Sequence, residues 1–240
     1  MTITDSHLHE VEWGIEHLMH DVAFGDRYAV HDRVAVVAAA LLIDSGLQGL
    51  KSIPTAEIAR YAKTTESTMF RHFKGGREEI LKAGVDWCWS QVNQAVFDAE
   101  FESGFERESL RAIERTFDAV FRMFESPFLR LAGTGAFLSY RRSEKIQGDE
   151  RSEPQVKFER RLISMCEDVA SSCSLGPSDG VQMSAFLTNY AAACWYSWLI
   201  DEASYNKPGG LMNRELVLRG VTNYLETVQM TCAIDPHAIA

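Results

Sequence analysis

Apolar residues recur every three or four positions along most of this chain, and this spacing constrains the fold more than any other feature of the sequence. Between residues 31 and 45, one such stripe consists of Val34, Val37, Ala38, Leu41 and Leu42. A stripe with this period lies on one face of an α-helix. The signature of paired strands, in which apolar and polar residues alternate between tight Asn-Gly or Asp-Gly turns, is missing from the sequence. We therefore expect an all-α fold.

Proline and glycine interrupt the helical pattern and predict where the helices end. We expect three short helices at 31–45, 55–62 and 65–73, followed by a long helix that begins near Arg77. Further helices are predicted at 107–125, 127–141, 153–174, 178–204 and 211–231. A chain of 240 residues with 46% apolar residues can bury a substantial core, as one large domain or two small ones.

The sequence carries no sign of membrane insertion, secretion or disulfide bonding. No run of about 18 uncharged apolar residues occurs, and the first residues lack the basic flank and apolar run of a signal peptide. We therefore expect a cytosolic protein. The five cysteines are Cys88, Cys166, Cys173, Cys194 and Cys232. Because their number is odd and no C-x-x-C pair occurs, we expect reduced, mostly buried thiols.

Charge is distributed unevenly along this acidic chain. The net charge is −10, to which the segments 1–28, 29–85 and 86–240 contribute −5, +2 and −7. Within residues 51–77, six Lys or Arg residues face only Glu57 and Glu66. An acidic protein does not coat nucleic acid with its whole surface, but this basic segment predicts one small face that meets phosphate. An ordinary solvated surface is the alternative explanation of the same charges.

The segment 29–85 has the pattern of a helix-turn-helix motif, because a tight turn separates the second and third short helices at 54–73. In such a motif the second helix of the pair enters the major groove of DNA. Short hydroxyl side chains lie near the helix N-termini, where phosphate is favoured: Thr55, Thr65, Ser67 and Thr68. Basic side chains follow toward the next helix: Arg71, His72, Lys74 and Arg77. The pattern predicts double-stranded DNA as a partner.

Residues 33–81 resemble the N-terminal DNA-binding domain of the TetR (tetracycline repressor) family of bacterial regulators. The matching stretches are Val37-Ala38-Ala39-Ala40-Leu41, Ile58-Ala59-Arg60-Tyr61-Ala62, Ser67-Thr68-Met69-Phe70-Arg71-His72-Phe73 and Glu78-Glu79-Ile80-Leu81. Apolar, hydroxyl and aromatic residues match in a fixed order. The resemblance implies an all-helical, ligand-responsive transcriptional regulator, more often a repressor, in which the segment 86–240 binds an effector and dimerises. No enzymatic activity and no cofactor are implied.

The resemblance also implies roles for single residues. Thr65 caps the recognition helix and touches phosphate, while His72 and Arg77 clamp the DNA backbone. The first turn of this helix is exposed and would read the bases; it holds Glu66, Ser67 and Thr68. A glutamate there can accept a hydrogen bond from a cytosine amino group, but it repels phosphate.

The chain departs from the family pattern at several positions of the motif. Phe70 stands where the family usually has a tyrosine, so the packing is kept but the hydroxyl contact to phosphate is lost. Lys63 replaces the usual turn glycine, which costs roughly 1 kcal/mol if the residue is held at positive φ. Thr64 replaces an apolar plug, and the Gly75-Gly76 loop is one residue longer than usual, which affects the alignment of Arg77.

The segment 86–240 is compatible with a dimerisation domain. Its penultimate helix carries the small-residue run Tyr190–Cys194, which permits close helix approach, and its last helix is apolar at helical spacing. Two such helices from each subunit would form a four-helix interface. The candidate interface residues of this homodimer are Ala192, Trp195, Leu216, Val221 and Leu225. Packing within one chain is the alternative.

Aromatic residues gather in the middle of the sequence and predict an apolar pocket for a small lipophilic or aromatic effector. The candidate pocket residues are Trp87, Phe117, Phe121, Phe124, Phe137 and Tyr140. A plain core explains the same residues. Residues 1–28 form an acidic N-terminal extension, in which Glu10–Phe24 shows a weak apolar stripe that indicates an added amphipathic helix.

Two other functions compete with DNA binding. Asp5-Ser6-His7-Leu8-His9 looks like the H-x-H metal pair that opens many amidohydrolases, but such enzymes need further ligands on later strands, and no strands are predicted. A TetR-like fold that has lost DNA binding and serves as a ligand-binding or protein-interaction module is the stronger rival. Lys63, Glu66 and Phe70 are the residues that favour it.

Overall fold

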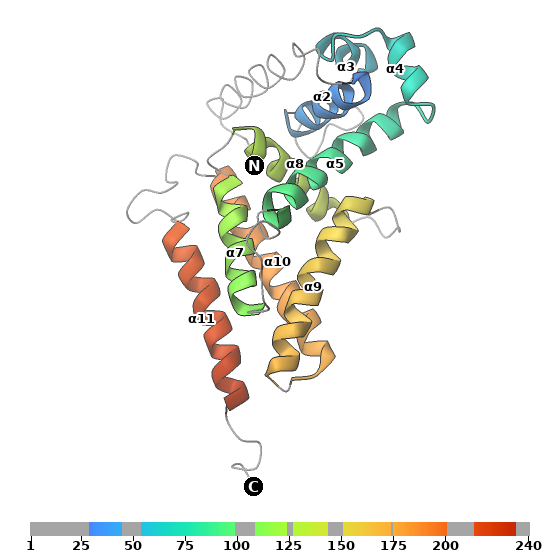
Figure 1. Cartoon of the computed structure of the whole chain (residues 1–240). Coiled ribbons are helices and arrows are strands. Elements are labelled where there is room, and N and C mark those ends of the chain that lie inside the picture. The colour runs from blue at the N-terminus through green and yellow to red at the C-terminus, as the bar shows by residue number, and fades with distance from the viewer. Residues whose placement is uncertain are drawn as a thin grey trace. The chain divides into compact units, whose positions relative to one another are not determined.

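The computed structural model describes residues 29–44, 54–98, 109–123, 127–143, 151–173, 175–200 and 214–233. These ranges are helical and hold no strand, which confirms the predicted all-α class (Figure 1). The helices are α2 (Val30–Asp44), α3 (Thr55–Tyr61), α4 (Glu66–His72), α5 (Arg77–Asn93), the π-helical turn η2 (Gln94–Asp98), α7 (Ser109–Arg122), α8 (Pro127–Ser143), α9 (Glu153–Ser172), α10 (Pro177–Ile200) and α11 (Arg214–Ala233). The predicted helices match these within a few residues. The predicted helix Glu10–Phe24 and the histidine pair near the N-terminus lie outside the described residues.

The chain divides into two compact units. Unit 1 consists of Met1–Asn93 and Met123–Gln155, and unit 2 consists of Gln94–Arg122 and Val156–Ala240. Unit 1 is thus larger than the predicted DNA-binding segment 29–85, because α8 packs with α2 and α5.

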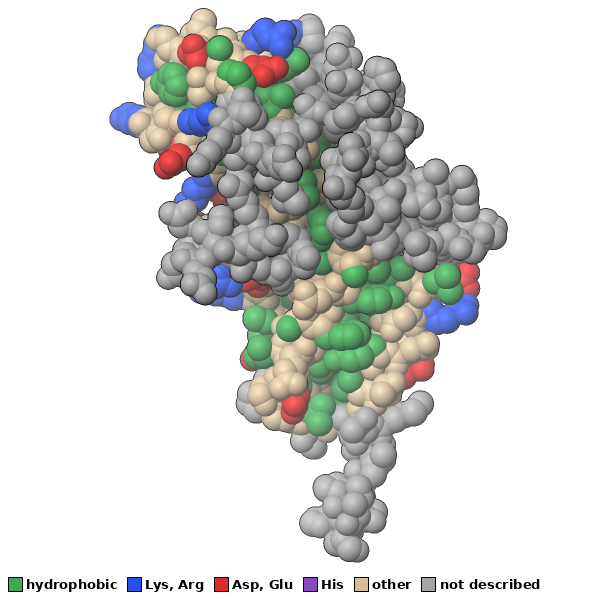
Figure 2. Space-filling model, turned by 180° about the vertical axis from the view of Figure 1, so that it is seen from behind, with side chains coloured by type: hydrophobic (Ala, Val, Ile, Leu, Met, Phe, Trp, Pro, Cys, Tyr) green, Lys and Arg blue, Asp and Glu red, His purple; other side chains and the backbone are tan. Residues whose placement is uncertain are grey.

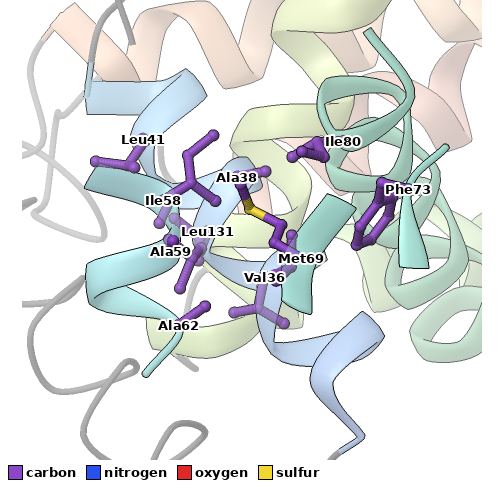
Figure 3. Close-up of a cluster of buried hydrophobic side chains, with 13 residues drawn as sticks. Val36, Ala38, Leu41, Ile58, Ala59, Ala62, Met69, Phe73, Ile80 and Leu131 are labelled. Carbon is purple, nitrogen blue, oxygen red and sulfur yellow. The ribbon is translucent and has the colours of Figure 1, made fainter. Parts of the chain in front are cut away.

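The core of unit 1 forms around α2, whose residues Val34 to Leu41 are all buried. Figure 3 shows side chains from α3, α4 and α5 gathered around this helix, among them Ile58, Met69 and Ile80, each with no exposed surface. At Gly84 of α5 a Cβ atom would lie 2.8 Å from the backbone nitrogen of Ala39. Only glycine therefore permits this close approach of α5 to α2.

Buried polar groups gather at the end of α5. The indole N–H of Trp89 donates to Ser139 Oγ at 2.9 Å, and the Asn93 amide donates to the carbonyls of Trp89 and Pro154. Asp86 accepts a hydrogen bond from Ser152, which also caps α9 by accepting from the backbone N–H of Gln155. Burial raises the pKa of the Asp86 carboxyl above its ordinary value, and Lys82 and Ser152 oppose this rise.

The helices of unit 2 approach one another closely. A Cβ atom on Gly180 of α10 would lie 2.7 Å from the Cα atom of Glu167 on α9. The Thr222 hydroxyl of α11 donates to the Glu114 carboxylate of α7 at 2.7 Å. The unit's core includes Ile113, Phe117, Phe121, Leu162, Val169, Leu187, Val217, Val221 and Leu225.

The cysteines that the structure describes are free thiols, as predicted. Cys88, Cys166 and Cys194 are buried, and Cys173 is half-buried. Burial raises the pKa of Cys166 to about 12 and that of Cys194 to about 11. These two thiols therefore stay protonated at neutral pH, which makes them poor nucleophiles. Among the described helices, none combines the length and the apolar character that crossing a membrane requires.

Candidate nucleic-acid interface

The turn between α3 and α4 is a Schellman motif. The backbone N–H of Thr64 donates to the carbonyl of Ala59 at 3.0 Å, and that of Lys63 donates to the carbonyl of Arg60 at 3.2 Å. Lys63 lies at the position that glycine usually takes, and its φ of 48° is positive, which is the case in which a side chain costs roughly 1 kcal/mol. The carbonyl of Ala62 accepts from Arg33 Nε of α2 at 3.1 Å, which ties the turn to the first helix.

The start of α4 is capped by Thr65, as predicted, while the phosphate contact of this residue stays a prediction. Thr65 has an extended backbone, and its hydroxyl oxygen accepts from the backbone N–H of Thr68 at 3.1 Å. The same hydroxyl donates to the Thr68 side chain at 3.0 Å. The cap satisfies one of the N–H groups that a helix leaves without a partner in its first turn.

A second side-chain contact connects the beginnings of the two helices. The Thr55 hydroxyl, in the first residue of α3, donates to Glu66 Oε1, in the first residue of α4, at 2.6 Å. Glu66 is exposed and Thr55 is half-buried. The bond is charge-assisted, because its acceptor is a carboxylate, and such bonds are short and strong. It therefore restrains a long side chain that would otherwise be mobile.

The inner and outer faces of α4 differ sharply in chemistry. Met69 and Phe73 are buried, and the Phe73 ring stacks on His31 of α2 with the ring centroids 4.7 Å apart. The side chains on the outer side are exposed, namely Glu66, Ser67, Phe70, Arg71, His72 and, just after the helix, Lys74. Phe70 keeps 39% of its surface exposed, although it is apolar. Thr68 is half-buried. Burial thus holds α4 by one face and leaves Glu66 and Ser67, two of the three predicted base-reading residues, exposed.

The loop after α4 leads directly into α5. Gly76 has φ at 72°, a conformation that glycine adopts without strain. The backbone N–H of Gly75 donates to the Glu79 carboxylate at 2.6 Å, and the backbone N–H of Gly76 donates to the carbonyl of Phe73 at 3.1 Å. Arg77, the first residue of α5, is half-buried.

Positive charge surrounds the short helices. Arg60, Lys63, Arg71 and Lys74 are exposed, and Figure 2 shows Lys and Arg side chains spaced around this part of unit 1. Arg60 has partners within the protein: a guanidinium nitrogen lies 3.6 Å from Glu57 Oε1, and the guanidinium carbon lies 4.3 Å from the centre of the Tyr61 ring. The outer face of α3 and α4 therefore offers cations and hydroxyls to an anionic partner.

The comparisons with known proteins agree with this geometry. No protein-family model and no curated protein matches the sequence. Among solved structures, the chain is similar to the crystal structure of a "putative TetR-family transcriptional regulator from Rhodococcus sp.", with a TM-score of 0.54 and 15% sequence identity. The match covers 84% of this chain and 96% of that one. The chain has the TetR-like fold.

Within this TetR-like fold, the predicted pocket residues do not gather in one unit. Trp87 packs against the core of unit 1, and Phe137 is half-buried on α8 of the same unit. Phe117 and Phe121 are buried in unit 2. The side chains of Phe124 and Tyr140 lie outside the described part. The aromatic pocket therefore stays a prediction.

The predicted interface residues on α10 and α11 differ in exposure. Trp195, Val221 and Leu225 are buried inside unit 2, as packing within one chain requires, and Ala192 is half-buried. Leu216, in contrast, keeps 51% of its surface exposed. The homodimer therefore stays a prediction for this set of residues.

The structure leaves large apolar side chains of α10 and α11 exposed, of which sequence reasoning missed Val181 and Phe186. Phe186 and Val181 of α10 are each 47% exposed, and Leu216 of α11 is 51% exposed. The Phe186 ring stacks on Tyr224 of α11 at 4.2 Å and on Tyr190 at 6.2 Å between centroids. Figure 2 shows hydrophobic side chains gathered on this side of unit 2. We call the three exposed side chains Val181, Phe186 and Leu216 the α10–α11 patch. Leu216 is a predicted interface residue, whereas Val181 and Phe186 were not predicted.

A metal centre finds no support in the described ranges, where no group of three His, Cys, Asp or Glu side chains is placed to hold an ion. The histidine pair His7 and His9 lies outside those ranges.

Proposed function

We propose that the protein is a DNA-binding transcriptional regulator that recognises duplex DNA through α3 and α4. The observation that carries this proposal is the helix pair itself. A Schellman turn and the Thr65 cap set its geometry, and its outer face is polar and basic. In helix-turn-helix proteins the second helix enters the major groove while surrounding groups hold phosphate. Here α4 is that second helix.

The proposed regulator acts as a homodimer on a palindromic operator. The α10–α11 patch supports this, because exposed apolar side chains that gather on one side of a folded protein commonly mark an interface. A second copy of the chain is the proposed occupant, and a two-fold axis would then present two recognition helices to half-sites about 34 Å apart. The candidate interface residue Leu216 belongs to this patch.

We further propose that the regulator is a ligand-responsive repressor. A small lipophilic or aromatic effector would bind between the helices of 86–240 and change the distance between the two recognition helices. Because half-site spacing is a strict geometric requirement, a small change of that distance releases the operator. The TetR-like fold supports this mode of action.

Selection of binding sites from a random duplex pool at low salt tests the proposal. The expected result is a palindromic site of two half-sites. Replacing Arg71 or Lys74 by Ala should weaken binding to all sequences and lower the slope of log K against log salt by about one for each lost phosphate contact. Arg219→Ala is the matched control, because Arg219 is an exposed cation of α11 that pairs with Glu215 at 2.7 Å.

The rival function is a TetR-like module that binds a ligand or a protein but not DNA. Glu66 favours it, because an exposed carboxylate at the start of α4 repels phosphate. Phe70 favours it as well, since it has no hydroxyl to donate. If no duplex is enriched at low salt, this rival replaces the regulator.

A further inference from the structure

The hydrogen bond between Thr55 and Glu66 determines which oxygen of the Glu66 carboxylate is available to DNA. Thr55 Oγ1 donates to Glu66 Oε1 at 2.6 Å, so this oxygen of the carboxylate has a partner within the protein. Glu66 is the first residue of α4 and is exposed, so the other oxygen, Oε2, is the one left to meet DNA. The two residues lie 11 positions apart and belong to different helices.

The restraint matters because a glutamate side chain has several rotatable bonds. Ordering such a side chain on binding costs rotamer entropy. The hydrogen bond from Thr55 already restrains the Glu66 side chain in the free protein, so less rotamer entropy is lost when DNA binds. Its hydroxyl carries a single hydrogen, which the bond to Glu66 uses. Thr55 therefore acts here on a neighbouring side chain, whereas its position in the motif alone predicted a phosphate contact.

A carboxylate oxygen in the major groove accepts hydrogen bonds and cannot donate them. Guanine presents two acceptors there, and thymine presents an acceptor and a methyl group, so both disfavour a carboxylate. Adenine offers an amino group, but its N7 acceptor lies beside it. Cytosine presents an amino donor without a neighbouring acceptor of its own. The base that best fits Glu66 Oε2 is therefore cytosine.

We propose that Glu66 selects a cytosine at one position of each operator half-site and that Thr55 is the positioning residue that aims its carboxylate. This inference rests on the proposed DNA-binding function and names the base that it reads. Because Glu66 also repels phosphate, the pair lowers affinity for duplexes that lack the cytosine. The same residue that weakens the general attraction to DNA thus raises discrimination.

The test compares site selection and duplex binding for the wild-type chain, Glu66→Gln, Thr55→Val and Thr55→Ser. The wild-type site should hold a cytosine at one position of each half-site, and any other base there should weaken binding about tenfold. Glu66→Gln keeps an oxygen for Thr55 but presents N–H donors instead of Oε2. Its preference should therefore move away from cytosine to a base with an acceptor.

Thr55→Val removes the hydroxyl but keeps the shape of the side chain. It should reduce the cytosine preference to about twofold, while affinity for the best site changes less than about threefold. Thr55→Ser retains the hydroxyl and should restore the preference. A merely structural role of Thr55 would instead shift binding to all duplexes together and leave the base preference intact.

The outcomes separate this inference from the proposed function. If the wild-type chain binds a defined site and Glu66→Gln selects the same base at every position, the inference is wrong and the regulator stands. An unchanged cytosine preference in Thr55→Val overturns the positioning role. If the wild-type chain enriches no duplex, both proposals are wrong.

Discussion

The side-chain hydroxyl of Thr65 accepts a hydrogen bond from the backbone N–H of Thr68 at 3.1 Å, and this contact determines where α4 begins. The helix has seven residues, too few to be stable in water by itself. Its position therefore depends on the cap at one end and on the burial of Met69 and Phe73. These contacts hold the exposed face of α4 in a defined orientation.

Replacing Thr65 by Ala should lower the free energy of unfolding by about 1 kcal/mol, because one N–H group of the first turn of α4 loses its partner. Chemical denaturation followed by circular dichroism measures this change. Thr65→Ser keeps the hydroxyl and should stay close to the wild type. Ser67→Ala, at an exposed neighbouring position, should change stability by less than about 0.5 kcal/mol. Equal stability of Thr65→Ala and the wild type would contradict the capping role.

Replacing Lys63 by Gly should raise the free energy of unfolding by about 1 kcal/mol, because glycine adopts a φ of 48° without the steric cost that a Cβ atom brings. Lys63→Ala is the matched control, since it removes the same charge but keeps the Cβ atom. Urea midpoints of the two variants show whether charge or backbone conformation matters. If both variants behave alike, the strain at Lys63 is negligible.

Replacing Phe70 by Tyr should tighten DNA binding about three- to tenfold, because the new hydroxyl extends an exposed side chain and can donate to phosphate. Stability should change little, as the ring keeps its packing. Titration of a selected duplex at fixed salt measures the gain. Phe186→Tyr adds the same hydroxyl to an exposed ring in unit 2 and should leave DNA affinity as it was. A weaker complex with Phe70→Tyr would place this side chain against bases instead.

Replacing Leu216 or Phe186 by Glu should convert the proposed dimer into a monomer, because either change places a charge in the α10–α11 patch. Leu216 is 51% exposed and Phe186 is 47% exposed, so neither substitution buries a charge within one chain. Sedimentation velocity measures the mass. Ser171→Glu adds the same charge at an exposed site of α9 and should stay dimeric. A wild-type chain that sediments as a monomer would refute the interface.

Replacing Asp86 by Asn should stabilise the protein at neutral pH and have a smaller effect in acid. Burial raises the pKa of Asp86, so the folded state disfavours its ionised form. The native state takes up the proton at higher pH than the unfolded chain does. The contribution of protonated Asp86 to the free energy of unfolding is therefore fully present below its ordinary pKa. It is lost as the pH rises through the raised pKa of the folded state.

An asparagine at position 86 carries no such penalty and can still accept from Ser152. Its advantage over the wild type should be largest near pH 7 and should shrink toward pH 4. Thermal unfolding at several pH values measures the difference. Asp168→Asn removes a charge from an exposed site and should show no comparable trend. A constant difference across the pH range would exclude ionisation of Asp86 as its cause.

Local patterns in the sequence predicted the helices and much of the turn. Thr65 precedes an apolar run at the position of a cap, and Lys63 stands where the resemblance to the TetR family implies a turn glycine. Both features depend on hydrogen bonds between residues close in sequence, and such bonds follow from residue type and spacing. The short helices were predicted for the same reason.

Contacts between helices were not predictable in this way. The bond from Thr55 to Glu66 depends on how α3 and α4 cross, and neither residue type requires the other. Trp195 and Val221 were candidates for a subunit interface, with packing within one chain as the alternative, and they are buried within unit 2, whereas Phe186 was not predicted and is exposed. Apolar periodicity identifies a face that avoids water, but it does not tell whether the same chain or a second one covers that face.

The sequence by itself thus determined an all-α chain with a helix-turn-helix segment, because helical period, caps and turn residues act over a few neighbouring positions. Only the tertiary structure decided that Thr55 holds the carboxylate of Glu66, that α8 completes the unit around α2, and which apolar side chains of α10 and α11 stay outside. These relationships arise from the packing of helices distant in sequence, where the available space and the orientation of each face select the contacts.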